Sequence, residues 1–96
     1  MANANLSLQI IPAVEEEDLY AAVDEVIALI KESGFPYIVG PMETTVEGDL
    51  SALLQLVRDA HELCAQRGVP RVVSVVKIDY KPDGVTMDEK IAPHRR

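Results

Sequence analysis

The sequence predicts a single α+β domain, built as one antiparallel sheet with two helices on the same face. Two long segments have the apolar spacing of amphipathic helices, and each is flanked by segments that favour β-strands. The stretch between the helical segments, Tyr37–Gly48, contains two short β-prone runs separated by Gly40 and Pro41. The chain has 96 residues, 48% of them hydrophobic, which is enough for one core. We therefore assign residues 1–96 to one domain.

The first strand and the first helix are predicted from two different periodicities. Residues Leu6–Ile11 alternate between two faces, which predicts a half-buried strand that Pro12 ends. The acidic run Glu15–Asp18 then favours the start of a helix, and Gly34 and Pro36 stop it. The apolar face of this helix comprises Leu19, Val23, Val26, Ile27 and Ile30.

The stretch Tyr37–Gly48 has two interpretations. Proline cannot adopt the positive φ of a two-residue type I′ turn, so a hairpin here requires a wider turn, with Gly40 as the permissive residue. Alternatively, the whole stretch is one bent strand, and the sheet has three strands. We favour the hairpin.

The second half of the chain repeats the order of helix and strand. Asp49 is a candidate N-cap, and Gly68 lies just after the helix that follows it. One stripe of this helix carries Leu50, Leu53, Leu54, Val57, His61 and Cys64. Arg71–Tyr80 is rich in β-branched residues and predicts the last strand. A turn then leads to a short helical tail, Met87–Ala92, which Pro93 breaks.

The resulting order, strand-helix-strand-strand-helix-strand, is that of the ferredoxin-like fold. Its antiparallel sheet has the strand order 4-1-3-2, and both helices cover one face. Alternation then assigns Val72, Ser74, Val76 and Ile78 to the core side of the last strand, and Tyr37, Val39, Thr44 and Val46 to the core side of the hairpin.

The other face of the sheet, which we call the open face, is predicted to gather polar side chains from three strands. Alternation places Ser7 and Gln9 between two residues of the third strand and two of the fourth. Met42, in the hairpin turn, could cap a pocket there or simply support a subunit contact. The candidate ligand-binding residues are Ser7, Gln9, Met42, Thr45, Glu47, Lys77 and Asp79.

The open face also carries an apolar set that favours assembly into a homo-oligomer. Ile11, Ile38, Val73 and Val75 would be costly to leave in water, at about 25 cal/mol per Å². We therefore expect a second copy of the chain to cover this face, as a dimer or tetramer, with the polar residues forming a pocket at the seam.

Charge and composition exclude several classes of partner. The net charge of −7 and the scattered Lys and Arg disfavour nucleic acid and anionic membranes. RNA-binding sheets carry aromatic residues where this open face has Ser7, Gln9, Thr45 and Glu47. No apolar run approaches the roughly 18 residues of a membrane span, and the polar start does not match a signal peptide. We expect a cytoplasmic protein, and the single Cys64 agrees with a reducing compartment.

Catalytic groups are sparse, so we predict no catalytic residues and no metal. His61 lies on the apolar stripe of its helix, where a hydrogen-bonded structural role is favoured. His61 and Cys64 have no further His or Cys nearby to complete a metal site, and Cys64 lies far from any helix N-terminus that would stabilise a thiolate. An enzyme built as a barrel-like dimer remains an alternative, provided that His61 points away from the core.

Several segments in order resemble the small thiamine-binding, YkoF-like family. They are LSLQIIP (6–12), GPMETTVEG (40–48), AHELC (60–64) and GVPRVVSVVKID (68–79). The resemblance covers about residues 6–90 and implies a ferredoxin-like fold that assembles as dimers or tetramers. Relatives often carry a small residue where this chain has Glu43, and the C-terminal helix is shortened by Pro93.

The resemblance implies that the chain binds thiamine or its hydroxymethylpyrimidine part, without catalysis and without a cofactor, for sensing, buffering or delivery. Carboxylates and hydroxyls suit an aminopyrimidine and a cationic thiazolium. Strand alternation supplies the hypothesis that Glu47 or Asp79 bonds the aminopyrimidine, that Ser7, Gln9 and Thr45 orient it, and that Lys77 keeps the carboxylates ionised. The alternative is a homo-oligomeric interaction module with no physiological small ligand.

Overall fold

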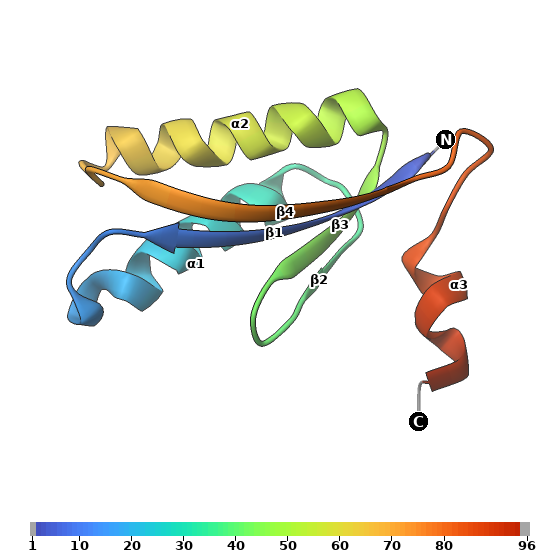
Figure 1. The fold of residues 1–96 in the computed structure, drawn as a ribbon, viewed down its shortest axis with the longest axis horizontal. Coiled ribbons are helices and arrows are strands. Elements are labelled where there is room, and N and C mark those ends of the chain that lie inside the picture. Colours follow the sequence, from blue (N-terminus) through green and yellow to red (C-terminus); the bar gives the residue numbers. More distant parts are fainter. Residues whose placement is uncertain (1, 95–96) are drawn as a thin grey trace.

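The structure is a computed structural model that describes residues 2–94. It contains four antiparallel strands in the order β2-β3-β1-β4, with α1 and α2 together on one face (Figure 1). The elements are β1 (Ala4–Pro12), α1 (Glu16–Glu32), β2 (Tyr37–Val39), β3 (Thr44–Gly48), α2 (Leu50–Gln66), β4 (Val72–Tyr80) and α3 (Met87–Ile91). The predicted ferredoxin-like fold and its strand order are confirmed.

The stretch between the helices forms a hairpin, as predicted. β2 pairs with β3 in antiparallel register, and the Gly40 N–H donates to the Glu43 carbonyl oxygen over 2.8 Å. The expected reason for Gly40 was wrong, because its φ is not positive. A Cβ at this position would lie 2.9 Å from the Glu43 carbonyl oxygen, so the turn requires glycine for space.

The core is an aliphatic layer between the two long helices and the central strands. Its most completely buried large side chains are Leu6, Ile30, Val46 and Leu53. The N-terminus of α2 is fixed by two side chains: Asp49 accepts from the Ser51 and Ala52 N–H groups, and Asn3 Oδ1 accepts from the Leu50 N–H. This cap agrees with the prediction for Asp49.

Leu54, expected on the apolar stripe of α2, is 47% exposed, and Leu56 is buried instead. Four strand side chains expected in the core are also exposed. Val76 and Ile78 lie on the helix side of β4 but are 37% and 44% exposed. α2 contacts β4 through His61 and Ser74, and Val76 and Ile78 lie beyond that contact toward the end of the strand. In the hairpin, Tyr37 and Val39 belong to β2, which forms the other edge of the sheet.

The C-terminal segment returns to the open face. α3 is followed by a 3-10 turn, Ala92–His94, that accommodates Pro93. Figure 1 shows α3 separated from α1 and α2. Val85 and Met87 are the buried side chains that begin this segment. Within residues 2–94, no helix has the length and hydropathy required to cross a bilayer.

Candidate functional site

The sheet register places three of the predicted site residues side by side on the open face. Ser7 pairs with Thr45 of β3 on one side and with Lys77 of β4 on the other. Ser7 and Thr45 are half-buried, and Lys77 is exposed. This row is the centre of the polar surface that alternation predicts.

The candidate site residues Glu47 and Asp79 lie on either side of Asn5, which was not among the candidates from the sequence. Asn5 pairs with both of them, from β3 and β4 respectively, and its side chain is only 4% exposed. The first strand was expected to begin at Leu6, whereas it begins at Ala4. Continuing the same alternation back from Ser7 would have identified Asn5.

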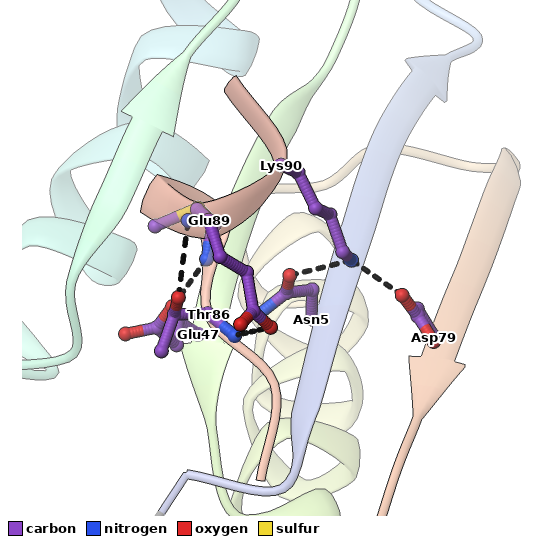
Figure 2. A network of polar contacts seen from close by, with 7 residues as sticks. Asn5, Glu47, Asp79, Thr86, Glu89 and Lys90 are labelled. Atoms are coloured by element: carbon purple, nitrogen blue, oxygen red, sulfur yellow. Dashed lines mark hydrogen bonds and ion pairs between the residues drawn. The ribbon is translucent and has the colours of Figure 1, made fainter. Parts of the chain in front are cut away.

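The C-terminal segment holds these carboxylates (Figure 2). The Met87 N–H donates to Glu47 Oε1 over 2.6 Å, and Lys90 Nζ lies 2.5 Å from Asp79 Oδ2 and 2.7 Å from Asn5 Oδ1. The ion pair to Asp79 therefore comes from Lys90, whereas the neighbouring cation expected from the sequence was Lys77. Lys77 lies earlier in β4 than Asp79, opposite Ser7.

Asn5 has one satisfied and one unsatisfied polar atom. An ammonium group can only donate, so the atom that faces Lys90 is the oxygen Oδ1. The amide nitrogen Nδ2 is buried and has no hydrogen-bond partner among the described residues. A buried donor without an acceptor is unfavourable by about 1–3 kcal/mol, and such a group is uncommon in folded proteins.

The other two predicted residues, Gln9 and Met42, line a cavity of about 350 Å³ near the end of β1 that is remote from Asn5, with α1 from the helix-covered face as one wall. The cavity lies between α1, the end of β1 and the β2–β3 turn. Glu43 contributes a carboxylate to it, whereas most of its wall is aliphatic. The apolar residues from α1 are Leu19, Val23, Val26, Ile27 and Ile30.

This cavity exists because two neighbouring strands have different lengths. β3 begins at Thr44, which pairs with Leu8, whereas β1 continues past Leu8 to Pro12. The turn after β2 then diverges from β1, so β1 has no strand partner on that side beyond Leu8. Tyr20 and Met42, 79% and 71% exposed, lie at the rim. Both aliphatic walls and polar edge groups are therefore available to a small molecule.

The predicted site residues consequently divide into two ends joined by the central row. Gln9 and Met42 belong to the cavity end, whereas Glu47 and Asp79 belong to the tail end with Asn5. Asn5 and Gln9 are four residues apart on one strand, which corresponds to roughly 13 Å at about 3.3 Å per residue. Alternation along the strands predicted that the strand residues share one face, but it did not predict that the site residues fall into two separate groups.

His61 and Cys64 both have structural surroundings. His61 Nδ1 lies 2.7 Å from the Val57 carbonyl oxygen, and Nε2 lies 2.9 Å from Ser74 Oγ. A carbonyl only accepts, so in the neutral imidazole Nδ1 carries the proton and Nε2 accepts from the Ser74 hydroxyl. Cys64 is buried, and burial together with the nearby Glu25 carboxylate raises the pKa of its thiol. The described residues contain no group of three or more His, Cys, Asp or Glu side chains placed to hold a metal.

Comparisons with known proteins identify relatives over nearly the whole chain. A UPF0045 protein from Clostridium perfringens is 52% identical over 99% of this chain and 100% of its own. Among solved structures, a domain of unknown function from Bacillus cereus has a TM-score of 0.90 at 39% identity, covering 99% of this chain and 93% of its own. A candidate thiamine biosynthesis/salvage protein from Thermotoga maritima has a TM-score of 0.91 at 34% identity, covering 97% and 99%.

The sequence pattern of one family matches residues 6–95, which include the cavity, Glu47, Asp79 and the segment that holds these carboxylates, whereas Asn5 lies just before the matched range. That family is described as thiamine-binding protein. The resemblance noted from the sequence is thus confirmed, and the chain belongs to the thiamine-binding protein family.

Proposed function

We propose that this protein binds thiamine, or its hydroxymethylpyrimidine part, without catalysing a reaction on it. The observation that carries the proposal is the aliphatic cavity of about 350 Å³ with Gln9 and Glu43 in its lining. Family membership and the thiamine-related description of the Thermotoga maritima protein support the same ligand class. Such binding would serve sensing, buffering or delivery in the cytoplasm.

The chemistry of the cavity suits the two rings of such a ligand. Aliphatic side chains from α1 and the exposed Met42 would remove ring surface from water. The Gln9 amide both donates and accepts, so it could bond an aminopyrimidine, which carries ring nitrogens and an amino group. The Glu43 carboxylate would attract the permanent positive charge of a thiazolium. No cofactor is part of the proposal.

The open-face residues would extend this site along β1. Ser7, Thr45 and Lys77 continue the polar surface from Gln9 toward the tail end. Glu47 and Asp79 would bond the aminopyrimidine only if the ligand reaches that end, where the C-terminal segment now holds them. Binding at the cavity end therefore predicts a role for Glu43, in the turn before β3. Binding at the tail end predicts a role for Glu47, in β3.

Titration calorimetry with thiamine and with hydroxymethylpyrimidine separates these arrangements. At the cavity end, Glu43→Gln should weaken thiamine binding several-fold but leave the neutral pyrimidine unchanged, and Gln9→Leu should weaken both by about tenfold. Gln66→Leu, at the exposed end of α2, is the matched control. If Glu47→Gln weakens binding while Glu43→Gln does not, the ligand lies at the tail end. If thiamine and the pyrimidine do not bind the unmodified protein, the proposal fails.

A second candidate function, that of a homo-oligomeric interaction module, is favoured by the apolar residues left exposed on the open face. Ile11, Val73 and Val75 are 44–48% exposed beyond the part that the C-terminal segment covers. We propose that a second copy of the chain packs on this surface, whether or not a ligand binds, to give a dimer or a tetramer. His61 supports a non-enzymatic role in either case, because both of its ring nitrogens are engaged within the fold.

A further inference from the structure

The C-terminal segment, residues 85–94, is attached to the open face through a few polar contacts and two buried apolar side chains. Lys90 bridges Asn5 and Asp79, and the Met87 N–H bonds to Glu47. The buried apolar side chains of the segment are Val85 and Met87. Thr86 and Glu89 form a capping box within the segment, so part of the start of α3 is stabilised without the sheet, whereas the Met87 N–H bonds to it. Elements with few buried apolar contacts open at low free-energy cost.

We propose that Asn5, Glu47 and Asp79 form a cation-binding site, and that the chain's own Lys90 fills it as a displaceable occupant. Two carboxylates lie on either side of a buried amide oxygen, a donor set that favours an ammonium or a similar cation. The C-terminal segment is then a cap that closes the tail end of the polar row, and a cationic ligand on that row competes with it. The competition rests on the proposed function, whereas the cation site does not.

The unsatisfied nitrogen of Asn5 indicates which cations would displace Lys90. Nδ2 is a buried donor, and an ammonium group has no acceptor to offer it. A small molecule that presents both a donating cation or amino group and an acceptor nitrogen could bond the carboxylates, Oδ1 and Nδ2 together. Aminopyrimidines and amidines bearing an unprotonated ring nitrogen belong to this chemical class. Lys90 satisfies only part of the site.

The cation site is tested by removing Lys90 and supplying a free cation. In Lys90→Met, we expect amide hydrogen exchange of Met87 and Glu89 to accelerate at least several-fold, while β1 and α2 keep their protection. Methylammonium should restore the protection of these two amides, and methanol at the same concentration should not. Lys31→Met, on the exposed last turn of α1, removes the same charge and should exchange like the unmodified protein. Unchanged exchange in Lys90→Met, or equal rescue by methanol, would overturn the cation site.

Competition is tested by adding thiamine to the same proteins. Thiamine should accelerate exchange at Met87 in the unmodified chain, and Lys90→Met should bind thiamine about two- to fivefold more tightly, the magnitude of a partly exposed ion pair. Thiamine binding with identical affinity in both proteins would overturn the competition and leave the proposed function standing. Absence of thiamine binding in every variant would overturn the proposed function and the competition, while methylammonium rescue would still decide the cation site.

Discussion

At the scale of single residues, Asn5 combines a favourable and an unfavourable contact in one buried side chain. Asn5→Val removes the orphaned Nδ2 donor together with the bond from Lys90. These effects oppose each other, so the free energy of unfolding should change by less than about 1 kcal/mol. Asn5→Asp instead places a third carboxylate beside Glu47 and Asp79 at a buried position, and should cost more than about 2 kcal/mol. Urea denaturation measures both, and a large loss in Asn5→Val would mean that Nδ2 is satisfied.

Cys64 provides a prediction about pH. Burial, and secondly the Glu25 carboxylate, raise the pKa of its thiol above the ordinary value of 9.0, so the folded chain holds this proton to a higher pH than the unfolded chain. The free energy of unfolding should therefore fall as the pH rises above about 9. Cys64→Ala lacks this contribution and should lose about 1 kcal/mol at about pH 8, with the difference narrowing by about pH 10. A constant difference between the two proteins would contradict the assignment.

Strand alternation predicted the face of each polar residue but not its partners. Thr45, Glu47, Lys77 and Asp79 share the open face because side chains alternate at every step of a strand. The ion pair between Lys90 and Asp79 joins residues from a strand and a distant helix, and no local pattern specifies it. Likewise, the cavity at Gln9 depends on where β3 begins relative to β1, and the pattern of a single strand does not reveal this.

At the scale of elements, His61 and Ser74 join α2 to β4. Their contact of 2.9 Å links the helix to an edge strand that α2 otherwise covers poorly. A double-mutant cycle with His61→Ala and Ser74→Ala should give a coupling free energy of about 1 kcal/mol in thermal or urea unfolding. The exposed pair Arg58 and Glu62, on the same helix, is the control and should couple by less than about 0.5 kcal/mol. Equal coupling in both cycles would remove His61 from this role.

Local sequence signals predicted most helices and strands, but they did not predict how these elements pack against each other. Gly34 and Gly68 have the positive φ that ends a helix, and Asp49 caps α2, as the sequence indicated. The tail helix was also predicted. Its position on the open face was not, because that position depends on Asn5, Glu47 and Asp79, which only the sheet register brings together.

At the scale of the whole molecule, β4 is an edge strand with exposed apolar side chains that a single chain does not cover. It is nine residues long and lies at the edge of the sheet, with a neighbour among the described residues only on its β1 side. Apolar side chains are exposed on both of its faces: Val73 and Val75 on the open face, Val76 and Ile78 on the other. Long apolar edge strands favour pairing with another chain. The sequence predicted that Val73 and Val75 lie on the open face, whereas Val76 and Ile78 were expected in the core.

The two faces of β4 allow the mode of assembly to be distinguished. If open faces pack together, Val75→Glu should dissociate the oligomer, because it would bury a charge, whereas Val76→Glu should have little effect. If β4 edges join instead, neighbouring side chains meet on both faces, and both variants should weaken assembly. Size-exclusion chromatography with light scattering gives the mass at micromolar concentration. The unmodified protein should have two or four times the 10.5 kDa mass of one chain. A mass of one chain for the unmodified protein would refute assembly by either route, and the exposed apolar residues of β4 would then require a different partner.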